Sequence, residues 1–172
     1  MLIKLFTYCI FLGSVLFPLS AFAKNVHGIS EKNQSYFDLT KWNPLKTNSI
    51  ELSGKWNFAW KVASLQKAMR NKTLIAVPGS WNTFTKSPNG YGWYVTHVTL
   101  PDSTSSPLEL GLFFEKTYTA FNVYINGTKI HSCGKTGITE DVTIPMVNYQ
   151  LVKIPNRLLT KTLSIAVFVS NF

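Results

Sequence analysis

The sequence is poor in the residues that usually carry catalysis or bind metals. It contains two cysteines, Cys9 and Cys133, and three histidines, His27, His97 and His131. None of the histidines stands at a spacing typical of a zinc site. The sequence also lacks a glycine-rich phosphate loop and a Gly-x-Ser-x-Gly nucleophile motif. We therefore expect no catalytic residues of these kinds, no bound metal and no cofactor.

Acidic side chains are also scarce, with 8 aspartates and glutamates against 17 lysines and arginines. Most glycoside hydrolases need two carboxylates around the scissile bond. The adjacent residues Glu140 and Asp141 are a poor pair for this purpose, because neighbours in a strand point to opposite faces. We therefore predict that the chain by itself is not an enzyme.

The excess of positive charge is spread along the chain. Because the lysines and arginines form no cluster that would follow a phosphate backbone, we expect no nucleic-acid partner. A solvated basic surface is the favoured interpretation, and affinity for acidic glycans or anionic head groups is the alternative.

Long apolar runs are absent except near the N-terminus. Lys4 precedes a nearly continuous apolar stretch over residues 5–19, and Ala21 and Ala23 are the small residues that signal peptidase recognises. The stretch is shorter than the about 20 residues that span a bilayer, which favours cleavage over an uncleaved anchor. We predict a signal peptide over residues 1–23 and a mature chain, beginning at Lys24, that is periplasmic or secreted.

Removal of residues 1–23 also removes Cys9, so Cys133 would have no partner for an intramolecular disulfide. A lone cysteine is usually a small buried hydrophobic residue, and we favour that role over a reactive thiol. Residues 24–37 are polar and aperiodic, which is typical of a lead-in segment. Residues 38–172 are long enough to form one domain with its own core.

The remaining pattern is that of a β-protein. Apolar and other residues alternate over residues 108–115, 121–126 and 163–170, as in strands with one buried face. Residues 94–100 are rich in aromatic and β-branched side chains. Asn126-Gly127 predicts a hairpin turn with positive φ at both residues, and residues 62–70 are the only helix candidate. We predict an all-β jelly-roll sandwich with at most one or two short helices.

Aromatic residues gather in three segments between or beside the predicted strands: residues 78–82 (PGSWN), 90–94 (GYGWY) and 116–118 (KTY). Aromatic rings on loops are a common platform for sugars, with polar neighbours that fix orientation. The alternative is that the rings fill the core. We favour a place in the core for Trp56 and Tyr94. For Trp81, Tyr91 and Trp93 we leave both interpretations open. The predicted ligand-binding residues are Trp81, Asn82, Tyr91, Trp93, Lys116 and Tyr118.

Several short motifs that include these residues occur in a fixed order along residues 38–172. They are SGKWNF at residues 53–58, VPGSWN at 77–82, GYGWY at 90–94, VYING at 123–127 and VSNF at 169–172. Together they resemble the periplasmic sensor domain of bacterial seven-transmembrane receptors with diverse intracellular signalling modules. That domain is in turn similar to the sugar-binding jelly roll of family-two glycoside hydrolases.

The resemblance implies a galactose-binding-like β-sandwich that binds a small, carbohydrate-like ligand. In the receptors this domain precedes membrane helices in the inner membrane and a cytoplasmic output module. The leading hypothesis is therefore a sensory ligand-binding module. The alternatives are the non-catalytic sugar-binding domain of a family-two glycoside hydrolase and a free-standing secreted domain that binds a protein.

The resemblance also implies at least one further strand after Phe172, and membrane contact only through such a downstream region. We therefore expect that the domain is truncated at its C-terminal end. A strand left without its partner exposes a sheet edge, which is a route to dimerisation.

Overall fold

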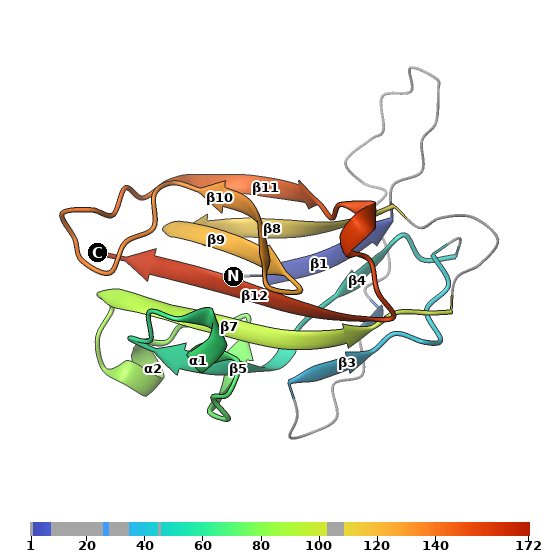
Figure 1. Ribbon diagram of the computed structural model, residues 1–172, viewed down its shortest axis with the longest axis horizontal. Coiled ribbons are helices and arrows are strands. Elements are labelled where there is room, and N and C mark those ends of the chain that lie inside the picture. Colours follow the sequence, from blue (N-terminus) through green and yellow to red (C-terminus); the bar gives the residue numbers. More distant parts are fainter. Residues whose placement is uncertain (1, 8–25, 28–34, 45, 103–108) are drawn as a thin grey trace, which may run out of the picture.

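The computed structural model describes residues 2–7, 26–27, 35–44, 46–102 and 109–172 as two β-sheets that share one core (Figure 1). The smaller sheet has five strands in the order β11 (Val147–Lys153), β8 (Leu110–Tyr118), β1 (Leu2–Thr7), β4 (Ser49–Glu51) and β2 (Val26–His27). The larger sheet runs β10 (Thr128–Cys133), β9 (Ala120–Ile125), β12 (Thr162–Asn171), β7 (Gly90–Thr99), β5 (Gly54–Trp60) and β6 (Leu74–Val77), and β3 (Tyr36–Asp38) also pairs with β7. The predicted all-β sandwich is confirmed.

The core lies between the two sheets. The alternation predicted for residues 163–170 is confirmed, because Leu163, Ile165 and Val167 are fully buried. They meet side chains from the smaller sheet such as Leu112 and Phe114, which are also fully buried. Burial of this apolar surface is the main source of the stability of the sandwich.

The larger sheet is also covered on its outer face. Trp93 of β7 and Ala166 and Phe168 of β12 point away from the main core and form a second cluster with Ala68. Ala68 belongs to the short helix α1 (Leu65–Ala68), which lies within the predicted helical segment. As a result β12 is buried on both faces, so its second set of side chains meets another layer and not solvent.

The Asn126-Gly127 turn joins β9 to β10 as predicted, with φ of 49° and 82° at the two residues. Asn126 also holds the chain that leads into β12. Its side-chain amide donates to the carbonyl oxygen of Leu158 at 2.9 Å, and its side-chain oxygen accepts from the backbone N–H of Ser164 at 2.8 Å. The turn therefore links the hairpin to its neighbour in the sheet.

Besides α1, the described chain contains the helix α2 (Asn82–Thr85) and a 3-10 turn, η2 (Asn156–Leu158). The helix content thus agrees with the prediction of at most one or two short helices. Among the residues that the structure describes, no helix is long and apolar enough to cross a membrane.

The N-terminal part of the chain contributes more strands than we expected. The predicted lead-in segment supplies β2, which pairs parallel with β4, and most of β3, which pairs parallel with β7. The first residues of the predicted signal peptide form β1. The apolar run from Tyr8 onward, the predicted cleavage site and Cys9 lie outside the described residues.

The expected dimerisation requires a strand at a sheet edge that has no partner on one side. β12, the strand nearest the end of the sequence, is paired on both sides, with β7 and with β9. In the smaller sheet β1 pairs with both of its neighbours. The strands at the ends of the two sheets are β11, β2, β10 and β6. Dimerisation through one of these edges stays a prediction.

Candidate functional site

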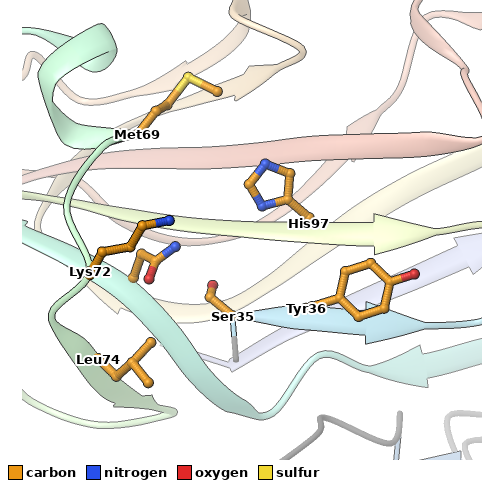
Figure 2. A pocket seen from close by; sticks show the side chains of 7 residues that line it. Ser35, Tyr36, Met69, Lys72, Leu74 and His97 are labelled. Atoms are coloured by element: carbon orange, nitrogen blue, oxygen red, sulfur yellow. The ribbon is translucent and has the colours of Figure 1, made fainter. Parts of the chain in front are cut away.

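A cavity of about 380 Å³ opens on the outer face of the larger sheet (Figure 2). In Figure 2, Met69, Lys72 and Leu74 lie on one side of it, and Ser35, Tyr36 and His97 on the other. Asn57 completes the lining. The cavity thus combines polar groups with the apolar side chains of a methionine and a leucine.

Strand pairing brings these residues together from distant parts of the sequence. Tyr36 of β3 is paired with His97 of β7, and Asn57 of β5 is paired with both Val95 of β7 and Leu74 of β6. Since paired residues share a face of the sheet, the tyrosine, imidazole and amide groups all project to the same side. The geometry of the site therefore depends on the register of four strands.

Hydrogen bonds fix the two residues from β3 and its start. The Ser35 hydroxyl is buried and donates to the carbonyl oxygen of Val95 at 2.5 Å. The Tyr36 hydroxyl shares a hydrogen bond of 2.6 Å with the hydroxyl of Thr99. The Asn57 amide lines the cavity and has both a donor and an acceptor to offer a ligand.

Two basic side chains set the electrostatics of the cavity. Burial lowers the pKa of His97, the nearby charge of Lys72 lowers it further, and the Ser35 backbone partly opposes them by raising it. The imidazole is therefore neutral at neutral pH, while Lys72 is exposed and carries a positive charge. No aspartate or glutamate is among the described residues that line the cavity.

The predicted aromatic platform is not gathered into one site. Trp81 is 4% exposed, and its ring lies 4.9 Å from that of Trp60 on the side of the main core. Trp93 is 3% exposed and belongs to the cluster on the opposite face of the sheet, with Phe168 at 4.8 Å. Their indole N–H groups donate to backbone carbonyl oxygens, those of Pro88 and Val62 respectively. Both rings therefore act as core, which was one of the two interpretations left open.

The other predicted ligand-binding residues are spread over the fold. Asn82 is exposed at the start of α2, and Tyr91 is half-buried with its hydroxyl donating to the carbonyl oxygen of Lys61. Lys116 and Tyr118 belong to β8, and their side chains lie outside the described residues. Whether any of the six predicted residues binds a ligand stays a prediction.

The residues that line the cavity were not predicted from the sequence. One pattern, the alternation along β7, could have indicated the position of His97. Alternation along β7 from Tyr91 places Trp93, Val95 and His97 on one face, so the histidine could have been assigned to the face of Trp93. Asn57 lies inside the SGKWNF motif. Ser35 and Tyr36 lay in the segment interpreted as a lead-in, where no pattern marks them.

The described residues contain no group of three or more histidine, cysteine, aspartate or glutamate side chains that could hold a metal ion. Cys133 is 1% exposed, as predicted for a small buried hydrophobic residue, and burial raises the pKa of its thiol. A buried thiol with a raised pKa is a poor nucleophile.

Comparison with known proteins supports the fold. No family model and no curated protein matches the chain. Among solved structures, the β-glucuronidase of Faecalibacterium prausnitzii is similar, with a TM-score of 0.53 and 24% sequence identity. The match covers 69% of this chain and 20% of the β-glucuronidase chain. At this identity the likeness concerns the sheet-rich fold, and the resemblance to receptor sensor domains stays a prediction.

Proposed function

We propose that this β-sandwich binds a carbohydrate-like small molecule in the cavity beside β3 without transforming it. The observation that carries the proposal is the composition of the cavity. Sugars need hydrogen-bonding partners for their hydroxyls and apolar contacts for their C–H faces. Asn57, Ser35 and His97 supply the former, and Met69 and Leu74 the latter. The fold shared with part of a glycoside hydrolase supports the same interpretation.

The positive charge of the cavity favours a sugar that carries a carboxylate as the proposed ligand. The ammonium group of Lys72 lies at the cavity, and no acidic side chain among the described lining residues opposes it. A lysine can form a charge-assisted hydrogen bond with a carboxylate, and such bonds are about twice as strong as neutral ones. The net charge of +9 of the chain favours the approach of anionic ligands in general.

The proposal excludes hydrolysis by the chain alone. The described residues that line the cavity include none of the carboxylates that glycoside hydrolysis needs. Glu140 and Asp141 are exposed and lie in the segment that joins β10 to β11. We expect no turnover of aryl glycosides or glucuronides; activity that disappears with Glu140→Gln or Asp141→Asn would contradict this.

The binding proposal is tested by calorimetric titration with glucuronic acid and, as its neutral match, glucose. We expect heat of binding with glucuronic acid and a weaker signal with glucose. Lys72→Ala should weaken the binding of glucuronic acid by about tenfold, since it removes a charge-assisted hydrogen bond, and should reduce the preference over glucose. Asn57→Ala should weaken both ligands.

The matched control is Lys129→Ala. Lys129 is also exposed but lies on β10, at the opposite edge of the same sheet. The three variants should unfold at the same temperature as the original chain. Equal affinities for Lys72→Ala and Lys129→Ala, or no binding by a folded chain, would overturn the proposal.

The sensory role is a further part of the proposal, supported by the ordered motifs of residues 38–172 and by the export pattern at the N-terminus. It places the domain outside the cytoplasm and couples ligand binding to a membrane receptor. Its rival is a sugar-binding accessory domain of a family-two glycoside hydrolase, to which the β-glucuronidase likeness lends support. N-terminal sequencing of the protein recovered from the periplasm tests the location, and we expect Lys24 as the first residue.

A further inference from the structure

The central strand of the smaller sheet comes from an unexpected part of the chain. β1 pairs antiparallel with β8 from Leu2↔Glu115 to Thr7↔Leu110, and antiparallel with β4 from Lys4↔Glu51 to Phe6↔Ser49. Leu5 is fully buried and belongs to the main core. The same residues begin the predicted signal peptide, whose cleavage after Ala23 would separate β1 from the domain.

Among the strands that the structure describes, β1 is the one that connects the two parts of this sheet by hydrogen bonds. The strand order is β11, β8, β1, β4 and β2, so β4 reaches β8 only through β1. Loss of β1 would leave the N–H and C=O groups of β4 and β8 facing a gap one strand wide. It would also leave a hole in the core at the position of Leu5. Unpaired strand edges of this kind bind other strands.

A gap between two strands is a stronger binding site than a single edge. An inserted segment can form backbone hydrogen bonds on both sides, and the pocket for alternate side chains selects which segment fits. Here the selecting position is that of Leu5, where the core accepts an apolar side chain of this size and excludes a charged one.

We propose that the gap between β4 and β8 is a strand-binding site. In the uncut chain it holds Leu2–Thr7. When that segment is removed, it accepts an extended peptide from another polypeptide, antiparallel to both strands, with a leucine-sized apolar side chain at the Leu5 position. This inference is independent of the ligand cavity, which lies on the outer face of the other sheet.

The test starts from the full chain, with a site for a specific protease inserted between Ala23 and Lys24. After folding and cleavage, a fluorescent peptide with the sequence of Leu2–Thr7 is added and its anisotropy is measured. The control peptide carries Leu5→Asp. We expect the first peptide to bind and to displace the cleaved fragment, and the control peptide to bind at least tenfold more weakly.

The outcome remains decisive if the cut chain unfolds when the fragment leaves. In that case the first peptide should restore the β-sheet circular dichroism spectrum, and the control peptide should not. Equal binding of both peptides, or no binding and no recovery with either, overturns the proposal. A cut chain that dimerises and binds no peptide would assign the gap to a second copy and also overturn it.

A second measurement uses the uncut chain. Leu5→Asp should displace β1 and increase amide hydrogen exchange in β4 and β8, while exchange in β12, which belongs to the other sheet, should stay slow. Uniform acceleration across both sheets, or none in β4 and β8, would contradict a separable strand.

Discussion

The outer faces of the two sheets differ in what covers them. On the larger sheet, Phe168 is 8% exposed because it packs against Trp93 and the segment that contains α1. On the smaller sheet, Tyr149 and Leu151 of β11 are 50% and 53% exposed. Figure 1 shows α1 beside β7, in the larger sheet. The larger sheet is therefore a middle layer at this point, and the smaller sheet is an outer layer.

The difference extends to how each sheet is built. The paired strands at the centre of the larger sheet, β7 and β12, are each 10 residues long and are paired along their whole length. In the smaller sheet β4 has 3 residues and β2 has 2, and the sheet is joined through β1. The larger sheet, with the longer continuous pairing, therefore carries the cavity. The smaller sheet closes the core and depends on β1 for its continuity.

The sharpest test of this comparison truncates one aromatic residue on each outer face. Phe168→Ala should lower the free energy of unfolding by about 3–5 kcal/mol, the usual cost for a buried phenylalanine. Tyr149→Ala should change it by about 0.5 kcal/mol, although its ring stacks on Phe113 at 6.1 Å, because half of the side chain is already in solvent. Urea denaturation measures both; equal losses would show that the two outer faces are equivalent.

A smaller effect is expected at the hairpin on the edge of the larger sheet. Gly127→Val should cost about 1–3 kcal/mol, because valine is strained at a φ of 82°. A side chain at this position would meet nothing within 4 Å, so the loss would come from the backbone alone. Gly127→Asn, which tolerates positive φ better, should cost less in the same denaturation experiment. Equal costs for valine and asparagine would rule out backbone strain as the cause.

The smallest effect is expected in the pH dependence of stability. It concerns His97, which lines the cavity on the outer face of the larger sheet. Burial and Lys72 lower the pKa of His97 below the ordinary 6.5, against a smaller opposing effect of the Ser35 backbone. The unfolded chain therefore binds the proton first as the pH falls, so stability declines below about pH 6.5 until the folded-state pKa is passed. The other titratable groups that line the cavity are Tyr36 and Lys72.

His97→Gln should remove this part of the pH dependence of the melting temperature. A decline in acid that is unchanged by His97→Gln would mean that other groups cause it.

The parts of the fold that could be predicted from the sequence are those with local signals. The alternation of residues 163–170 and the Asn126-Gly127 turn each depend on a few neighbouring residues, and both predictions were confirmed. β2 and β3 have 2 and 3 residues, too few to show a period, and they exist because distant strands pair with them. The same holds for β1, which pairs with residues more than a hundred positions away.

The candidate site was harder to predict for a related reason. Tyr36, Asn57 and His97 come together through strand register, which no single segment of the sequence reveals. For Tyr91 and Trp93 of GYGWY a loop platform and a place in the core were both left open, and for Tyr94 the core was favoured; residues 90–94 begin the strand β7. Because side chains alternate along the strand, Trp93 lies on the outer face of the larger sheet and Tyr94 lies in the main core. Aromatic composition indicated burial here, and the backbone conformation decided where.

The position of β12 has a consequence for how the chain folds as it is synthesised. β12 lies between β7 and β9, but residues 162–171 are translated after both of them. Until then the ribosome has produced a β9–β10 hairpin and a separate β5–β6–β7 unit with no strand to join them. The contacts that unite the sheet are distant in sequence, and such contacts form slowly. A nascent chain would therefore stay open to chaperones, proteases or an export machinery until its last described strand emerges and joins β7 to β9.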